Sequence, residues 1–190
     1  AAALVPQLVA GSVLVERVFG LPGTGQLLAD SVFSRDLPTV LGLTLCSGLA
    51  VVAAAKGLDV DEVTVVILDR PRNQARIQAV RDAGARIRLI TDGDVAPSLM
   101  AALPGTGIDI VMGIGGTPEG VITACAMHGL GGEIQGCLAP QSDDERARIE
   151  AAGIPIGRKV TLAELAAGDD HFFAATGITS GELLEGVRYT

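Results

Sequence analysis

The stretch GIGGTPEGV, residues 113–121, places bare glycine backbone directly before a helical pattern. Glycines such as Gly116 let the backbone approach a ligand without obstruction by a Cβ. Thr117 suits the N-cap and Pro118 the first helical position, so Glu119 falls in the first turn. Helix N-termini favour both carboxylates and bound anions, which repel each other unless a cation lies between them. The stretch therefore predicts a divalent metal ion that bridges Glu119 and a phosphate.

The segment LDRPRN carries Arg70 and Arg72 on either side of Pro71. Proline fixes its own φ angle and restricts the residue before it, so this loop is stiff. Two guanidinium groups in a stiff loop can hold a phosphate through paired hydrogen bonds. The alternative is that both arginines lie on the surface and only close a turn.

The segment TDGDVA carries Asp92 and Asp94 around Gly93. Paired carboxylates after a strand suit the binding of a metal ion or of sugar hydroxyl groups. The alternative is a plain Asp-Gly turn in which Asp94 caps the next helix.

These three segments each follow a short run that predicts a strand, at residues 64–69, 86–90 and 109–112. Strands and helices alternate along the chain, which indicates an α/β sandwich with a mainly parallel sheet. In such sheets, ligands collect beyond the carboxyl ends of the strands. The other expected elements are helices at 73–83, 95–102, 118–128, 142–152 and from 161, and a last strand at 171–178.

The composition narrows the classes of function. The 190 residues are 48% hydrophobic with 3% aromatic, and the formal net charge is −8. This charge argues against nucleic-acid binding, which requires a basic face. The three cysteines show no paired spacing and are expected to be reduced core thiols. The glycine turn lacks the G-x-G-x-x-G spacing after a first strand, which argues against a dinucleotide-binding module.

Residues 1–48 differ from the rest, because long apolar runs alternate with a few charges. The stretch GSVLVERVFGLPGTGQLLADSVFSRDLPTVLGLTL resembles the C-terminal part of permeases of peptide-type ABC transporters. We expect an apolar helical segment at 1–48 and a separate α/β domain at 49–190. The alternative function is a permease fragment with a cytoplasmic appendage, which would enter membranes through residues 1–55. The chain begins without Met and is expected to be an excerpt of something longer.

From residue 49 the chain resembles the second half of the bacterial class II (GlpX-type) fructose-1,6-bisphosphatases. The matching motifs are LDRPRN, DGD, GTGIDIVMGIGGTPEG, GGEIQG and FFAATGIT-x-GELLEGVRY. The resemblance implies the layered sandwich of the lithium-sensitive sugar-phosphatase superfamily and removal of the 1-phosphate from fructose 1,6-bisphosphate with Mn²⁺ or Mg²⁺. It implies a cytoplasmic enzyme of gluconeogenesis, a homo-oligomer when intact, with sedoheptulose 1,7-bisphosphate as a possible second substrate.

Carried over residue by residue, the resemblance assigns substrate binding and one metal ligand. It places Arg70, Pro71 and Arg72 in the phosphate segment, Asp92, Gly93 and Asp94 in the sugar segment, Gly116 at a substrate-contacting backbone position and Glu119 at a metal-ligand position. Asn73 stands where the family usually has His. In the family, the other metal-binding carboxylates and a threonine that positions water come from the first half of the enzyme. We therefore expect this chain alone to be weakly active or inactive.

Overall fold

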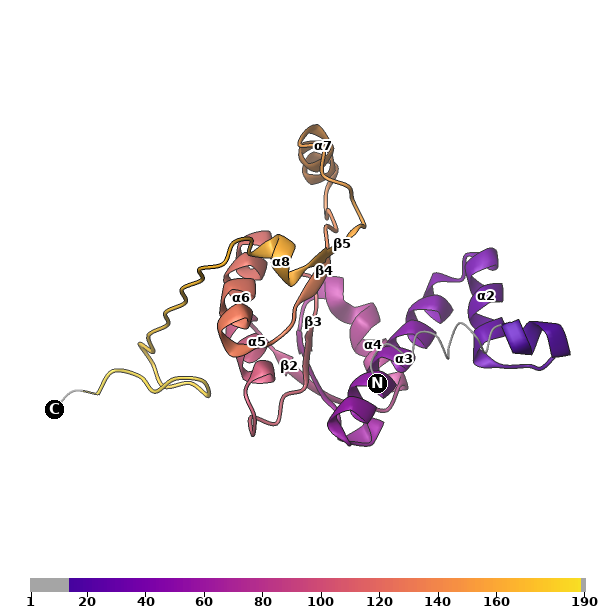
Figure 1. The fold of residues 1–190 in the computed structure, drawn as a ribbon, viewed down its shortest axis with the longest axis horizontal. Coiled ribbons are helices and arrows are strands. Elements are labelled where there is room, and N and C mark those ends of the chain that lie inside the picture. Colours follow the sequence, from indigo (N-terminus) through magenta and orange to yellow (C-terminus); the bar gives the residue numbers. More distant parts are fainter. Residues whose placement is uncertain (1–13, 189–190) are drawn as a thin grey trace. The chain divides into compact units, whose positions relative to one another are not determined.

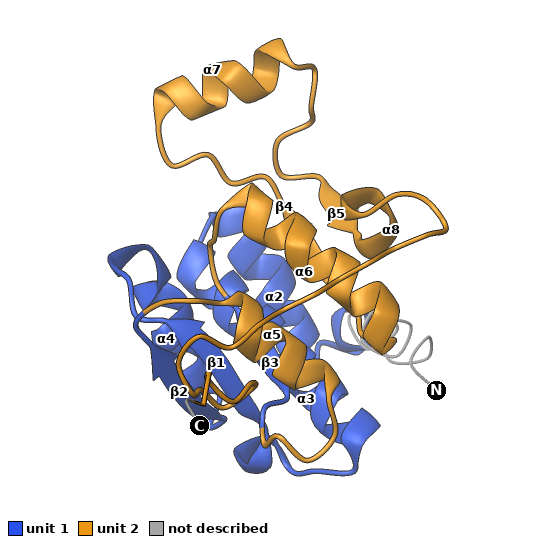
Figure 2. Ribbon diagram, turned by 90° about the vertical axis from the view of Figure 1, so that its left-hand side faces the viewer, with its two compact units in different colours: residues 1–91, 108–112 blue, residues 92–107, 113–190 orange. Residues whose placement is uncertain are grey.

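The computed structural model describes residues 14–188, and the chain divides into two compact units (Figure 2). The first unit holds Ala1–Thr91 and Ile108–Met112, and the second holds Asp92–Gly107 and Gly113–Thr190. Each unit is described by itself. The expected mixed α/β class with a parallel sheet is confirmed.

The first unit is built on a three-stranded parallel sheet in the order β2-β1-β3. The strands are β1 (Thr64–Leu68), β2 (Arg86–Ile90) and β3 (Ile110–Met112). Val65 of the central strand pairs with Ile87 on one side and Ile110 on the other. A parallel strand buried on both faces needs a continuous apolar, β-branched run, which TVVIL supplies. The three strand predictions were therefore right to within one residue.

Helices of the first unit begin and end at recognisable caps. The helix α3 (Leu37–Lys56) begins where the Asp36 carboxylate accepts hydrogen bonds from the N–H and the hydroxyl of Thr39, at 3.3 and 2.6 Å. It ends at Gly57, whose φ of 70° is the left-handed conformation that glycine favours. The predicted helix end at Gly57 is confirmed. The other helical segments are residues 14–19, α2 (Thr24–Ser34), η1 (Val60–Glu62), η2 (Pro71–Asn73) and α4 (Gln74–Asp82).

The core of the first unit joins α3 and α4 to the sheet (Figure 1). Leu49 and Ala53 of α3 are buried there, as are Ile77 and Val80 of α4, which the helical pattern places inward. The same α3, of 20 residues and mean hydropathy 1.9, is long and apolar enough to cross a membrane. It also runs without a break across the division predicted at residues 48 and 49.

The second unit consists mainly of helices and one antiparallel strand pair. Leu99 of α5 packs against Ala126 and Met127 of α6, and these residues form its core. The strands β4 and β5 pair antiparallel, with Gly136 opposite Val160, and this pair was not predicted. The elements are α5 (Val95–Ala102), α6 (Thr117–Leu130), β4 (Gln135–Cys137), α7 (Asp143–Ala151), β5 (Lys159–Thr161) and α8 (Leu162–Leu165).

The helices predicted from residues 142 and 161 are present, and each begins at a local cap. The Ser142 hydroxyl accepts a hydrogen bond from the N–H of Glu145, at 3.2 Å, and α7 follows. The Glu164 carboxylate accepts from both the N–H and the hydroxyl of Thr161, at 2.9 and 3.0 Å, and fixes the start of α8. The helix α7 stands away from the rest of its unit and none of its residues is buried (Figure 1).

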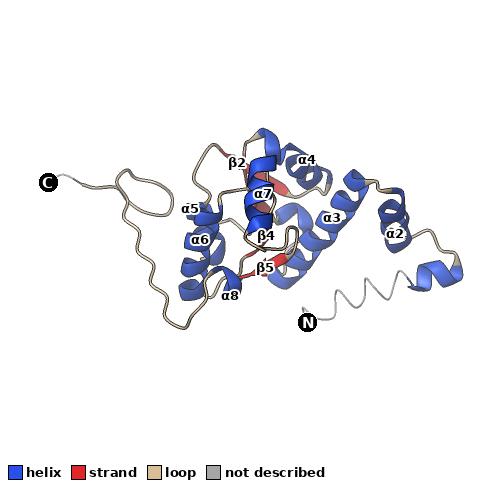
Figure 3. Cartoon of the chain, turned by 90° about the horizontal axis from the view of Figure 1, so that it is seen from above, coloured by secondary structure: helices blue, strands red, loops and turns tan. Residues whose placement is uncertain are grey.

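The last strand predicted, at residues 171–178, is wrong, because this segment has no regular secondary structure (Figure 3). A strand forms only when its backbone groups pair with a neighbour, and none of the described strands pairs with this segment. Instead, Phe173 packs on the core of the second unit and Phe172 is 89% exposed.

Candidate functional site

The predicted site residues follow the carboxyl ends of the three parallel strands. Arg70 comes two residues after β1, Asp92 two residues after β2, and the glycine turn starts directly after β3. Because all three strands run parallel, these ends leave the same edge of the sheet. This is the edge at which open α/β sheets bind ligands.

The arginine segment belongs to the first unit and forms a single tight turn. Pro71 opens the 3₁₀ turn η2, as its fixed φ favours. Arg70 and Arg72 are both exposed, so both side chains are accessible to a ligand. The N–H of Arg70 donates to the carbonyl of Leu68, at 2.9 Å, and the turn therefore continues directly from the end of β1.

The aspartate segment opens the second unit. The Asp92 carboxylate accepts a hydrogen bond from the N–H of Gly93, at 2.9 Å, and Gly93 adopts a φ of +74° that only glycine takes at little cost. Asp94 occupies the N-cap position of α5, but its side chain makes no capping hydrogen bond. The alternative of an Asp-Gly turn with Asp94 at the helix N-cap position therefore agrees with the backbone, although the Asp94 carboxylate takes no part in capping.

That carboxylate lies against the glycine turn. A Cβ placed on Gly115 would stand only 2.6 Å from Oδ2 of Asp94, closer than side chains approach. The Glu119 carboxylate folds back from α6 and occupies the space where a Cβ of Gly116 would be. The structure thus brings the side chains of Asp94 and Glu119 to two neighbouring glycines. It is the missing side chains at Gly115 and Gly116 that make room for both carboxylates.

The start of α6 differs by one residue from the prediction. Gly116, not Thr117, is the N-cap, and Thr117 and Pro118 are the first helical residues. No side chain caps this terminus. The reason is that Gly116 adopts extended backbone, with φ −73° and ψ 148°, so the helix starts one residue earlier. Glu119 remains in the first turn, and backbone N–H groups there lack helical acceptors.

The site could hold part of a cation's coordination shell. Glu119 is exposed and Asp94 is half-buried, and both present carboxylate oxygens, the ligands that Mg²⁺ and Mn²⁺ prefer. Within residues 14–188, no three His, Cys, Asp or Glu side chains lie close enough together to hold a metal ion. One or two carboxylates together with substrate phosphate are, however, the usual protein share of a Mg²⁺ site. The residues present therefore fit a cation held jointly with a phosphate.

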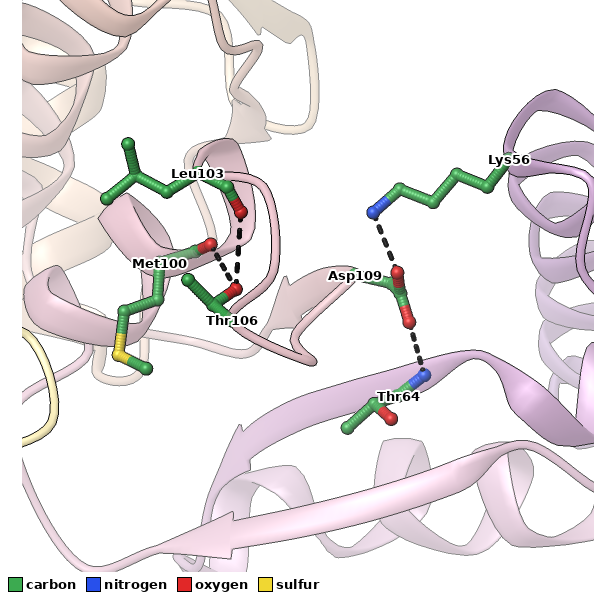
Figure 4. A network of polar contacts seen from close by, with 6 residues as sticks. All are labelled: Lys56, Thr64, Met100, Leu103, Thr106 and Asp109. Carbon is green, nitrogen blue, oxygen red and sulfur yellow. Dashed lines mark hydrogen bonds and ion pairs between the residues drawn. The ribbon is translucent and has the colours of Figure 1, made fainter.

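At the opposite ends of the strands, a partly exposed polar network links the sheet to α3 (Figure 4). Asp109 accepts a hydrogen bond from Lys56 Nζ at 2.7 Å and another from the N–H of Thr64 at 2.8 Å. Burial acts to raise the pKa of Asp109, but the bonds from Lys56 and Thr64 and the charges of Lys56 and Arg86 outweigh burial and lower it. Asp109 thus ties the start of β3 to β1 and to α3. The sequence analysis missed this role, and the only signal for it was an aspartate directly before a short apolar strand.

Asn73, which the sequence analysis noted only as standing where the family usually has His, follows the two arginines. It is fully buried, and its side-chain amide donates a hydrogen bond to the carbonyl of Leu68 at 2.9 Å. The sequence signal was its place at the end of the arginine turn, where a polar residue precedes an amphipathic helix.

Taken together, the chain has an α/β fold in which the candidate site residues follow the carboxyl ends of three parallel strands. The family described as bacterial fructose-1,6-bisphosphatase, glpX-encoded, matches residues 41–190, and the chain belongs to this family. The D-fructose 1,6-bisphosphatase class 2/sedoheptulose 1,7-bisphosphatase of Trichodesmium erythraeum is 40% identical over 186 residues, which covers 87% of this chain and 54% of that protein. The fructose-1,6-bisphosphatase 1 class 2 of Escherichia coli K12 is 40% identical over 160 residues, which covers 77% of this chain and 48% of that protein.

The chain therefore spans about half the length of the curated relatives it matches. These matches give no support to the resemblance of residues 1–48 to a permease. The family match begins at residue 41, inside α3 and ahead of the division predicted at residue 49. The separation into segments 1–48 and 49–190 stays a prediction.

Proposed function

We propose that this chain supplies the sugar-phosphate-binding part of a metal-dependent fructose-1,6-bisphosphatase. The observation that supports this most strongly is the meeting of the Asp94 and Glu119 carboxylates at the Gly115–Gly116 turn. The family membership and the names of the two relatives agree with it. The proposed substrate is fructose 1,6-bisphosphate, with sedoheptulose 1,7-bisphosphate as a second one.

Each proposed contact follows from the chemistry of its side chain. Arg70 and Arg72 hold a phosphate of the sugar by charge-assisted hydrogen bonds. Asp92 and Asp94 accept hydrogen bonds from sugar hydroxyl groups, and the backbone at Gly116 approaches the substrate closely. Glu119 is the metal ligand.

The proposed reaction is hydrolysis of the 1-phosphate ester. A water oxygen forms a bond to phosphorus, the bond from phosphorus to the oxygen on C1 breaks, and that oxygen takes up a proton. When bound, Mn²⁺ or Mg²⁺ would neutralise charge that develops on the phosphoryl oxygens. The residues of this chain bind and orient the sugar bisphosphate, and Glu119 balances the charge of the cation.

We further propose that the chain by itself binds the substrate but hydrolyses it slowly or not at all. Metal-assisted hydrolysis needs the cation held from several sides and a water aligned opposite the leaving oxygen. Two carboxylates and a glycine turn do not supply both. In the intact enzyme we expect a cytoplasmic homo-oligomer that acts in gluconeogenesis.

A binding experiment tests the proposal directly. Titration calorimetry of the whole chain with fructose 1,6-bisphosphate, in the presence and absence of Mn²⁺, should show binding that the cation strengthens. The double change Arg70→Ala and Arg72→Ala should weaken this binding, whereas Arg81→Ala, which removes an exposed arginine of α4, should not. Equal binding by all three proteins would contradict the proposed phosphate contacts.

The proposed role of Glu119 as a metal ligand is tested by measuring Mn²⁺ binding. The electron paramagnetic resonance signal of free Mn²⁺ should fall when the chain and the sugar bisphosphate are added, and Glu119→Gln should restore it. Phosphate release should stay close to the background rate in both proteins. Release at the rate of a full-length enzyme, abolished by Glu119→Gln, would overturn the claim that this chain is weakly active.

A further inference from the structure

Asn73 is the most completely buried polar residue beside the arginine turn. Its exposed fraction is 0%, although the arginines of the turn and the following Gln74 are exposed. Its Nδ2 donates to the carbonyl of Leu68 at 2.9 Å, and its backbone N–H donates to the carbonyl of Arg70 at 2.8 Å. One residue thus holds both the last residue of β1 and the first residue of the turn.

This arrangement has a physical reason. A buried polar side chain is costly unless it is hydrogen-bonded, so an asparagine is retained there only where its bonds serve the structure. The turn is a short 3₁₀ segment with backbone hydrogen bonds from Arg70 to Leu68 and from Asn73 to Arg70. The side-chain amide of Asn73 closes a further ring, because it joins the end of the turn directly to the last residue of β1. The ring fixes the direction in which Arg70 and Arg72 leave the end of β1.

We propose that Asn73 is a positioning residue for phosphate binding. It acts through the two arginines and does not touch the ligand. This inference rests on the proposed function, because it takes the arginines as the phosphate contacts. Fixed guanidinium groups lose less entropy when they bind than mobile ones, so ordering of the turn raises the affinity for phosphate.

The alternative is that Asn73 only stabilises the fold. The two roles differ in what a change at this position does. A purely structural role predicts a loss of stability with unchanged affinity for the sugar bisphosphate in the folded protein. A positioning role predicts a local loss of order at residues 70–74 together with weaker binding. Asn73→Asp is the informative change, because it keeps the shape and replaces the donor with an oxygen that faces the carbonyl of Leu68.

The experiment uses the whole chain and three variants. Asn73→Asp removes the donor, Asn73→His offers a ring N–H in its place, and Gln78→Ala is the matched control, since it removes an exposed side-chain amide that bonds Asp82 on α4. Amide hydrogen exchange measures order at each backbone N–H, and calorimetry measures binding of fructose 1,6-bisphosphate with Mn²⁺.

We expect Asn73→Asp to speed exchange at residues 70–74 and to weaken binding on the order of tenfold, the loss typical when a hydrogen-bonded support of a binding group is removed. The exchange rates and the affinity of Asn73→His should lie closer to those of the unaltered chain than to those of Asn73→Asp. Gln78→Ala should change neither the exchange at residues 70–74 nor the affinity. If Asn73→Asp does not fold, Asn73→Ser, which keeps a smaller donor, takes its place and is judged by the same measurements.

Faster exchange at the turn with unchanged affinity would overturn the inference, as would unchanged exchange at the turn. If the unaltered chain binds no sugar bisphosphate, the proposed function is contradicted and the positioning role falls with it. In that case the exchange data still decide separately whether Asn73 orders the turn.

Discussion

Single residues decide the geometry of the glycine turn. At Gly115 and Gly116 the absence of a Cβ leaves space for the carboxylates of Asp94 and Glu119. Sequence reasoning had already interpreted these glycines as positions of close backbone approach. The structure adds that the approaching groups include two acidic side chains of the chain itself.

We expect Gly115→Ala to displace the Asp94 carboxylate, because the new Cβ would lie 2.6 Å from Oδ2. The sugar contact proposed for Asp94 should then weaken, and calorimetry with fructose 1,6-bisphosphate should show a loss on the order of tenfold, or about 1.4 kcal/mol.

Gly120→Ala is the matched control for this prediction. Gly120 lies inside α6, and a Cβ there would meet nothing within 4 Å. Alanine should raise the free energy of unfolding by about 0.5–1 kcal/mol through helix propensity and leave binding unchanged. Equal loss of affinity in both variants would show that the glycine turn has no special role.

The hydrogen-bonded carboxylate of Asp109 makes stability depend on pH. Its pKa is lowered in the folded protein, so the ionised form is favoured by folding. The contribution is fully present above the unfolded pKa of 3.8 and is lost as the pH falls through the lowered folded pKa. We expect Asp109→Asn to reduce the free energy of unfolding by about 1 kcal/mol near neutral pH, and the difference between the two proteins to shrink as the pH falls below 3.8. Urea unfolding over a series of pH values checks this.

Some helices and strands of this chain can be predicted from its sequence, and others cannot. The strands at 64–68, 86–90 and 110–112 and the helices α5 and α7 lie close to their predicted positions, because local periodicity and capping residues determine them. The pair β4 and β5 was missed, since β4 (Gln135–Cys137) is exposed throughout and contains no apolar run of the kind that marks β3. The segment 171–178 has the pattern of a strand but lacks a partner, and partners depend on tertiary context that a local pattern does not contain.

The same distinction applies to the candidate site. Arg70, Asp94 and Glu119 could be named as candidate site residues from their chemistry and from their places after strands. The hydrogen bonds of Asn73 and Asp109 could not be predicted. The burial of Asn73 depends on tertiary packing, and so does the bond between Asp109 and Thr64, which lie 45 positions apart.

The cap of α8 allows a second test with pH. The Glu164 carboxylate accepts hydrogen bonds from Arg158 and Thr161, and these lower its pKa from 4.5 to about 2. Its contribution to the order of α8 should therefore be complete above pH 4.5 and disappear as the pH falls through about 2. NMR titration of the Glu164 side chain should show this midpoint. Arg158→Ala should move the midpoint back toward 4.5, and a midpoint near 4.5 in the unaltered chain would contradict the capping geometry.

For the whole molecule, the most unusual feature is the apolar surface near the start of the described chain. Val18, Phe19 and Phe33 are 75%, 72% and 76% exposed, and several further large apolar side chains between residues 14 and 37 are exposed as well. Large exposed apolar patches mark surfaces that associate with other molecules or with lipid. Burial of Leu49 and Ala53 in the first core shows that α3 also belongs to the packed fold.

We expect the triple change Val18→Ser, Phe19→Ser and Phe33→Ser to reduce self-association and binding to lipid vesicles while it leaves the melting temperature nearly unchanged. Phe172→Ser is the control, because Phe172 is 89% exposed in the other unit and isolated from this surface in sequence. Light scattering and vesicle co-sedimentation measure both effects. A loss of thermal stability in the triple variant would show that these side chains pack in solution.

The arm formed by β4, α7 and β5 has a practical consequence. Its helix is capped locally by Ser142 and buries none of its residues. Neither core draws a side chain from α7, so this helix is a natural position for inserting an affinity tag or a fluorescent reporter. A label placed there would follow the molecule without being built into either hydrophobic interior.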